Sequence, residues 1–391
     1  MPPSLTLPCL IGCLAAILLA ALIGSALRSM RVRHAWILSG VLAGMALGPQ
    51  GLGRVSPQLQ ASLFRGAAAE QRDADLTQRT LEVARSTARS QAASIDDADA
   101  SRLQADALAA RERLLAARQA FDFPAMWMVS LLATFVMIGA SPLLGRVEWW
   151  RDGGPAIGVW TAAAPAAGLL VAMTLHAPGA AEPWWICAAA IACVGAAPAR
   201  ARDRWVGVQL AGPMAAGADG AGAVAGLLSL TLVLVAAWTG VCSELAWLMP
   251  WGGLMAAWGL ASTPPRAVRR LSRVALAGTV AIACSRLDFP AEWNGWLALW
   301  TLVAIDDLKW LGATIGLVLW GRLGWARSLR VCLPLADASP AIAAMASVAL
   351  LAGAVPAWMA ASLLLAAAAA SLMEPLRRGT ALQLERAAHG A

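Results

Sequence analysis

Three charged residues interrupt the apolar run TLVAIDDLKWLGATIG at 301–316, namely Asp306, Asp307 and Lys309, and Lys309 is the only lysine of the chain. An ionised side chain at the centre of a membrane helix costs about 2.5–3.5 kcal/mol, so such residues are functional-site candidates by default. Asp306 and Lys309 are three residues apart and would share one face of a helix. They either serve a buried ion site or neutralise each other within a scaffold.

Two further charged residues lie in apolar surroundings. Asp219 falls in GPMAAGADGAGAVAG, among residues small enough to expose its carboxyl group and to let neighbouring helices approach closely. A carboxyl group there can hold a proton or a hard cation, because hard cations prefer oxygen ligands. Arg286 lies in ACSRLDF, where it either has a functional role or extends its guanidinium group to the outer interface.

The segments that must position these residues are those of a membrane protein. Of 391 residues, 59% are hydrophobic and 14% charged, whereas soluble domains are about 45–50% apolar and about 25% charged. We therefore expect an all-α polytopic membrane protein with about 11 transmembrane helices. The apolar stretches lie at 5–27, 35–53, 124–144, 155–175, 183–198, 206–238, 245–260, 274–289, 293–320, 331–355 and 356–373.

The arginines predict the orientation of these segments. The connections at 28–34, 145–152, 199–205, 261–273 and 321–330, together with the tail after Pro375, hold 18 arginines. The short connections that alternate with them hold none. The positive-inside rule places the arginine-rich set in the cytoplasm. We therefore expect a multi-pass protein of the cell (inner) membrane with its N-terminus outside and its C-terminus inside. The net charge of +7 follows from this topology and indicates no nucleic-acid partner.

Residues 54–122 are polar and rich in alanine, with ten arginines against ten acidic residues. Helix-forming composition at 67–93 and 100–121 predicts a helical hairpin outside the membrane, with Ser94 and Asp97 as a capping signal between the arms. The hairpin would pack on itself or on a second protomer, as a spacer or as a partner-binding element. The chain then divides into 1–53, 54–122 and a transmembrane core at 123–391.

Four stretches resemble the bacterial monovalent cation:proton antiporters of the Na+/H+ exchanger type, of which this chain looks like a divergent member. They are RVRHAWILSGVLAGMALGPQGLG, ACSRLDF, LKWLGATIG and LLAGAVPAWMAASLLLAAAAASLMEPL. The resemblance implies an inverted-repeat fold, a homodimer, and monovalent cations and protons as the transported species. It implies that Asp219 is the ion-binding carboxylate, that Lys309 is the intramembrane lysine and that no cofactor is needed. Ala218 stands where relatives keep a second acidic or amide residue, and Asp306 could replace it.

Two proline-interrupted segments, GAAPA at 195–199 and DASPA at 337–341, occupy corresponding places in the two halves. They are either ordinary kinked helices or the discontinuous helices that hold the site of inverted-repeat transporters. Carbonyl groups freed near Pro198 and Pro340 would complete the cation's shell. The mechanism expected is exchange of a proton for Na+, Li+ or K+ at Asp219 by alternating access.

Other classes of protein remain as alternatives. One is a non-transporting membrane scaffold whose external hairpin binds a partner, and another is a channel-like K+ efflux protein. Seven cysteines lie within or at the edge of apolar stretches, without a CxxC or Cys/His cluster, which predicts buried small side chains and no metal site. No nucleophile–base or metal constellation indicates an enzyme.

Overall fold

The computed structural model describes residues 3–30, 35–66, 68–91, 97–140, 154–176, 184–196, 213–239, 245–259, 266–292, 294–320, 324–332 and 340–389. Within these ranges every regular element is helical and no strand occurs, so the all-α class is confirmed. Residues 92–96, with the predicted cap residue Ser94, lie outside the described residues.

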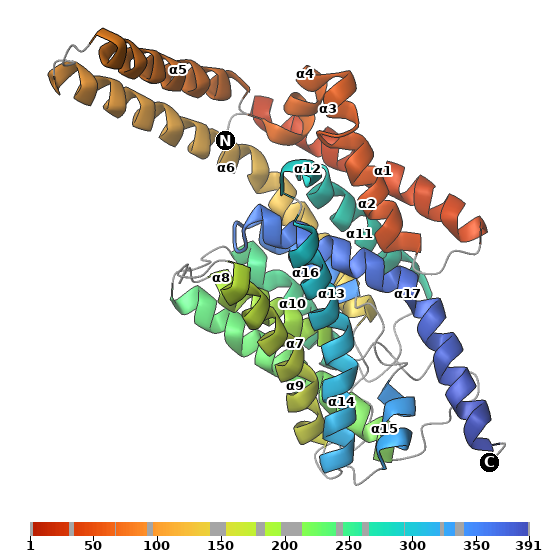
Figure 1. The fold of residues 1–391 in the computed structure, drawn as a ribbon. Helices are drawn as coiled ribbons and strands as arrows, with labels where there is room; N and C mark the ends of the chain where they lie inside the picture. Colours follow the sequence, from red (N-terminus) through yellow and green to blue (C-terminus); the bar gives the residue numbers. More distant parts are fainter. Residues whose placement is uncertain are drawn as a thin grey trace.

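Seventeen α-helices and two π-helical turns make up the described part of the chain (Figure 1). In chain order they are α1 (Pro3–Ser29), α2 (Ala35–Leu47), α3 (Leu52–Val55), α4 (Pro57–Gln60), η1 (Ala61–Arg65), α5 (Ala68–Gln91), α6 (Asp97–Ala140), α7 (Gly154–His176), α8 (Trp184–Ala196), α9 (Pro213–Trp238), α10 (Leu245–Gly259), α11 (Arg266–Cys284), α12 (Phe289–Glu292), α13 (Gly295–Leu302), η3 (Val303–Asp307), α14 (Leu308–Leu319), α15 (Trp325–Cys332), α16 (Pro340–Leu351) and α17 (Ala357–His389).

One group of helices forms around α11, which packs against α1, α2 and α6. Small residues allow the closest of these approaches. A Cβ atom at Gly40 of α2 would lie 2.7 Å from the carbonyl oxygen of Ala277 in α11, and one at Gly44 would lie 2.8 Å from that of Ala281. Glycines four residues apart on one helix face are the usual means of bringing two membrane helices into backbone contact.

A second group forms around α7, which packs against α8, α9 and α14. The turn η3 and helix α13 also contact α7, and η3 connects α13 directly to α14. The segment from Gly295 to Leu319 is therefore one helix with a single π-helical turn inside it. At its start the Leu297 backbone N–H donates to Asn294 Oδ1 at 3.0 Å, which caps the helix.

Helices α16 and α17 connect the two groups, because α16 packs against α6, α8 and α11, while α17 packs against α2 and α13. Every residue from Ala341 to Ala349 is buried. Most of these residues are alanine, whose small side chain lets neighbours approach α16 on all sides. A helix that is apolar all round is expected to be buried in this way.

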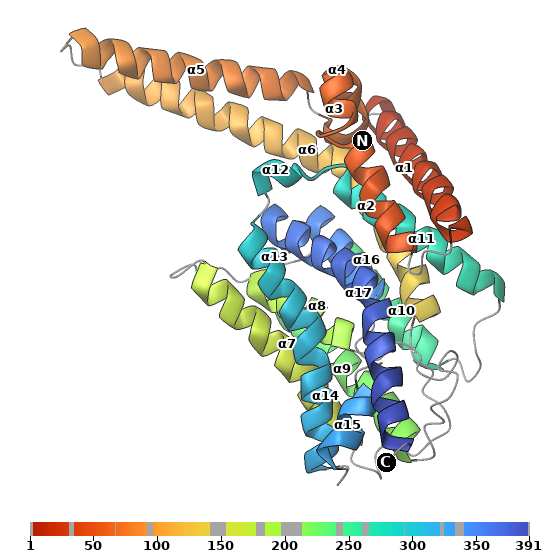
Figure 2. The ribbon, with the colours of Figure 1, turned by 45° about the vertical axis from the view of Figure 1, so that its right-hand side comes forward.

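The helical hairpin predicted within 54–122 is present, since α5 and α6 pack antiparallel and project from the rest of the molecule (Figures 1 and 2). The inner positions follow helical spacing and are partly buried, except Ala110, which is fully buried: Ala74, Thr77, Leu81 and Ala84 on α5, and Leu103, Ala107, Ala110 and Leu114 on α6. The second arm does not end at Phe121. Helix α6 continues through Pro124 to Ala140 as one helix of 44 residues, so the domain boundary placed at 122/123 falls inside it.

Each of the eleven apolar stretches contains helix, although parts of several lie outside the described residues. Three helical segments among those described are long and apolar enough to cross a membrane: Leu7–Ser29, Ala35–Val55 and Arg102–Gly139. Five others are apolar but shorter: Val159–Val171, Trp184–Cys193, Gly226–Trp238, Pro340–Leu351 and Ala357–Met373. The membrane class is thus supported by three segments, and the number of about eleven spans stays a prediction.

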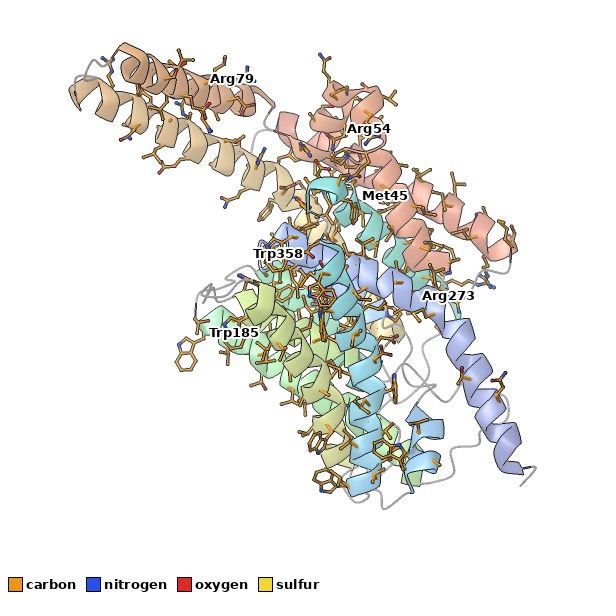
Figure 3. The ribbon with its side chains drawn as sticks, in the orientation of Figure 1. Met45, Arg54, Arg79, Trp185, Arg273 and Trp358 are labelled. Carbon is orange, nitrogen blue, oxygen red and sulfur yellow. The ribbon has the colours of Figure 1, made fainter. Side chains whose placement is uncertain are left out.

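Tryptophan side chains gather near both ends of the helical body. The Trp184 and Trp358 rings meet edge to face with centroids 5.1 Å apart, while Trp185 points outward from α8 (Figure 3). Near the opposite end, Trp160 at the start of α7 contacts Trp320, which follows α14, with centroids 6.1 Å apart. Tryptophan is enriched at the two interfaces of a membrane, where its ring is partly apolar and partly polar.

Candidate functional site

The predicted charged pair on the ninth apolar stretch is buried. The side chains of Asp306 and Lys309 are 3% and 2% exposed, whereas Asp307 between them is exposed. Asp307 accepts a hydrogen bond from Trp310 Nε1 at 3.3 Å. The expectation that Asp306 and Lys309 share one face is consistent with this burial pattern.

A π-helical turn, η3, contains Asp306 and ends immediately before α14. The Leu308 backbone N–H donates to the carbonyl oxygen of Val303, five residues earlier, instead of the residue four earlier. Such turns insert one extra residue into an α-helix and occur frequently at functional sites. The extra residue shifts the helical register by about 100° for everything that follows.

Helix α7 supports this turn from one side. It contacts both η3 and α14, and a Cβ atom at Gly312 would lie 2.5 Å from the carbonyl oxygen of Trp160. Gly312 therefore lets the α7 backbone pack directly against α14, three residues after Lys309. Helix α9, which carries Asp219, packs against the same helix α7.

Not all predicted site residues are described to the same extent. Asp219 lies in α9, but its side chain is outside the described part of the structure. Pro198 also lies outside the described residues. Pro340 is the first residue of α16, where the fixed φ of proline suits a helix start and its missing N–H costs no hydrogen bond. The pairing of two broken helices therefore stays a prediction.

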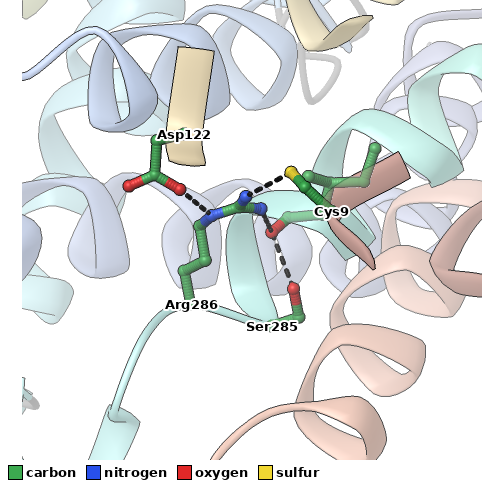
Figure 4. Close-up of polar contacts among 5 residues, drawn as sticks. Cys9, Asp122, Ser285 and Arg286 are labelled. Atoms are coloured by element: carbon green, nitrogen blue, oxygen red, sulfur yellow. Dashed lines mark hydrogen bonds and ion pairs between the residues drawn. The ribbon is translucent and has the colours of Figure 1, made fainter. Parts of the chain in front are cut away.

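Arg286 forms an ion pair with a residue that the sequence did not single out (Figure 4). Its Nε donates to Asp122 Oδ1 of α6 at 2.9 Å. Its Nη1 donates to the carbonyl oxygen of Ile282 at 3.4 Å, and its Nη2 lies 3.7 Å from Cys9 Sγ of α1. The Arg286 side chain is 9% exposed and that of Asp122 is 34% exposed. The guanidinium group thus joins α1, α6 and the end of α11.

A second set of polar contacts follows directly after Arg286. Gln50 Nε2 donates to the carbonyl oxygen of Leu287 at 3.4 Å and to Asp288 Oδ1 at 3.3 Å. These contacts fasten the end of α2 to the end of α11. Burial raises the pKa of the nearby Glu292 above its ordinary value. A hydrogen bond with the Asp288 backbone and the charge of Arg65 oppose this rise, whereas the charge of the Asp288 carboxylate adds to it.

Asp122 and Gln50 were missed because their partners are far away in the chain. Asp122 and Arg286 are separated by 164 residues, and Gln50 and Asp288 by 238. One signal was available for the first pair. Asp122 is the last acidic residue before an apolar stretch, and Arg286 lies near the end of another, so two charges of opposite sign lie at the ends of two predicted helices.

The described residues contain no group of three or more His, Cys, Asp or Glu side chains that could hold a metal ion. The described cysteines, Cys9, Cys13, Cys187, Cys193 and Cys284, are buried thiols that form no disulfide with one another. What the site offers chemically is therefore a pair of buried ionisable side chains on a π-helical turn. Comparison with known proteins adds nothing to this chemistry, since no family model, curated protein or solved structure matches the chain.

Proposed function

We propose that this protein exchanges monovalent cations, Na+, Li+ or K+, for protons across a cell membrane by alternating access. Asp219 would bind the proton and the cation in turn. Lys309 would balance the charge of the buried acidic site when no cation is bound, and Asp306 would supply the second carboxylate. A homodimer is the assembly that we expect from the resemblance to cation:proton antiporters.

The observation that carries the proposal is the burial of Asp306 and Lys309 within an otherwise apolar helix. Each is costly there, so a chain without a use for ionisable groups would replace them with apolar residues of similar volume, often without loss of stability. Buried acids and lysines that lie on a broken or widened turn are the groups that transporters use to bind ions.

The packing of the α7 group is a second support. Helix α7 is the common neighbour of α9, which carries Asp219, and of α14, which carries Lys309. Movement of this group against the group around α11 would expose a site between its helices alternately to the two sides. The three membrane-length helices and the tryptophans near both ends of the body fit a protein embedded in a bilayer.

Proton flux in everted membrane vesicles tests the proposal. Addition of Na+, Li+ or K+ should dissipate a preformed pH gradient in vesicles that contain the protein. Asp219→Asn, which keeps the volume but loses the titratable proton, should abolish the flux, and Asp306→Asn should reduce it. Asp307→Asn is the matched control, because Asp307 is adjacent but exposed. Unchanged flux in Asp219→Asn vesicles would refute exchange at this carboxylate.

A partner-binding scaffold is the second candidate, and the shape of the hairpin favours it. The hairpin projects from the body (Figure 2) and carries exposed apolar side chains, among them Leu76 and Val83 on α5, seven residues apart. Vesicles without flux for any alkali cation would favour this function. A photoreactive residue at position 76 should then form a cross-link with a protein, whereas one at the equally exposed Leu18, within the membrane-length segment of α1, should not.

A further inference from the structure

One buried hydroxyl group in the site helix has no hydrogen-bond partner. Thr301 is 0% exposed, and its Oγ1 has no partner among the described residues. Among the described residues, the other buried hydroxyl groups donate to a backbone carbonyl oxygen, except that of Ser328, which also has no partner. Thr161 makes an interaction of another kind. Those that donate are Ser39, Ser130, Ser229, Ser272, Thr279, Ser285, Thr314, Ser347, Ser362 and Ser371.

The π-helical turn aligns Thr301 with the two charged residues. In a regular α-helix, Thr301 and Lys309 would differ by eight residues and about 80° around the axis. The extra residue of η3 makes the separation equivalent to seven residues, or about 20°. By the same shift Thr301 and Asp306 become equivalent to neighbours one turn apart. All three side chains are buried, as one shared face requires.

A buried hydroxyl group without a partner destabilises the fold, because it has lost its hydrogen bonds to water without gaining others. Thr314, on the same helix, avoids this cost by donating to the carbonyl oxygen of Trp310 at 2.8 Å. Thr301 does not make the corresponding bond, so its oxygen lone pairs and its proton are both available. The position is therefore suited to a ligand that needs oxygen atoms.

We propose that the Thr301 hydroxyl and the Asp306 carboxylate together bind a dehydrated alkali cation within the η3 turn. This inference rests on the proposed function for its ligand class, and it assigns a ligand to Thr301 that the resemblance does not. Hard cations take oxygen ligands, and a neutral hydroxyl beside one carboxylate suits a single positive charge better than a divalent ion, whose sites carry more acidic ligands.

Cation-dependent thermal stability of the purified protein in detergent tests the inference without relying on flux. The melting temperature is measured against NaCl, LiCl and KCl, with choline chloride keeping the ionic strength constant. A cation that binds only the folded state raises the melting temperature with concentration, which gives its apparent Kd. Thr301→Val, which replaces the hydroxyl with a methyl group, should raise that Kd about tenfold. Thr301→Ser should restore it.

Thr314→Val is the matched control, since Thr314 is equally buried but its hydroxyl is already bonded. It should leave the apparent Kd unchanged, even where it lowers the melting temperature in choline. An unchanged Kd in Thr301→Val overturns the inference, as does a wild-type protein that no alkali cation stabilises beyond choline.

The two proposals fail separately. Cation binding that depends on Thr301, in a protein without proton flux, would overturn antiport but keep the site. Antiport that is unaffected by Thr301→Val would overturn the site but keep the proposed function.

Discussion

The ion pair between Asp122 and Arg286 gives the most quantitative prediction, because its two partners differ in exposure. Removing one partner leaves the other charge behind, and the cost depends on how well water can reach that charge. Arg286 is 9% exposed and Asp122 is 34% exposed. We therefore expect loss of the aspartate to destabilise the protein more than loss of the arginine.

The expected free energies of unfolding follow from the geometry. Asp122→Ala leaves the guanidinium group with only the long contacts to Ile282 and Cys9, and should cost about 3 kcal/mol, the low end for breaking a buried pair. Arg286→Met keeps the apolar stem and leaves a carboxylate that water can reach, so it should cost about 1.5 kcal/mol. Asp122→Asn keeps an oxygen acceptor for Nε and should cost about 1 kcal/mol.

Unfolding can be followed with a thiol-reactive fluorogenic dye, since the described cysteines are all buried in the folded state. The exposed ion pair between Asp73 and Arg113, 3.6 Å apart on the hairpin, is the internal control. Asp73→Ala should change stability little, because both partners are well hydrated. A double-mutant cycle of Asp122→Ala with Arg286→Met should give a coupling energy of about 1.5 kcal/mol or more.

Two results would refute this reasoning. A coupling energy near zero would mean that the 2.9 Å contact is not made in the folded protein. A larger loss of stability from Arg286→Met than from Asp122→Ala would mean that burial of the charge left behind is not what sets the cost.

Three further outcomes are expected. Gly66→Ala should destabilise the base of the hairpin by about 1–3 kcal/mol, because Gly66 has φ of 56° and an added Cβ would collide with the Phe121 ring; equal melting temperatures would contradict this. Lys309→Met should lower thermal stability and Asp306→Asn should partly restore it in the double variant, whereas purely additive losses would show that they do not interact. Glu292 has a raised pKa in the folded state, so the folded state binds more protons than the unfolded state does. The free energy of unfolding should therefore fall as pH rises from the ordinary glutamate pKa of about 4.5 through the folded-state pKa. Glu292→Gln should remove that part of the pH dependence, measured as melting temperature between pH 4 and 8, and an unchanged slope would contradict it.

The helical class and the hairpin could be predicted because both depend on local sequence. Alanine-rich, charged arms at 67–93 and 100–121 correspond to α5 at Ala68–Gln91 and to the first part of α6. The end of the second arm could not be predicted. The change from polar to apolar composition near Phe123 suggested a boundary, whereas backbone hydrogen bonds continue through it, and Pro124 does not end the helix.

The candidate site was predictable in part for the same reason. The burial of Asp306 and Lys309 follows from apolar neighbours in the sequence. The η3 turn could not be predicted from the sequence. One extra residue in a helical turn does not change the amino-acid composition, and the turn depends on packing against α7. Asp122 was missed because an ion pair across 164 residues depends on the tertiary fold. The sequence places the two charges at the ends of predicted helices but does not show that those two ends meet.

The inner-face residues of the α5–α6 hairpin recur at alternating intervals of three and four residues. This spacing decides by how many residues the projecting arm can be lengthened. Seven residues rotate an α-helix by about 20° short of two full turns and extend it by about 10 Å. Seven residues added to α5 together with seven added to α6 would therefore lengthen the arm and keep the same faces in contact. An insertion of five or nine residues would instead turn one inner face away from its partner, by roughly 140° or 180°. The distance that the hairpin reaches from the body is therefore expected to change in steps of whole helical repeats, such as seven or eleven residues, that keep the inner faces in contact.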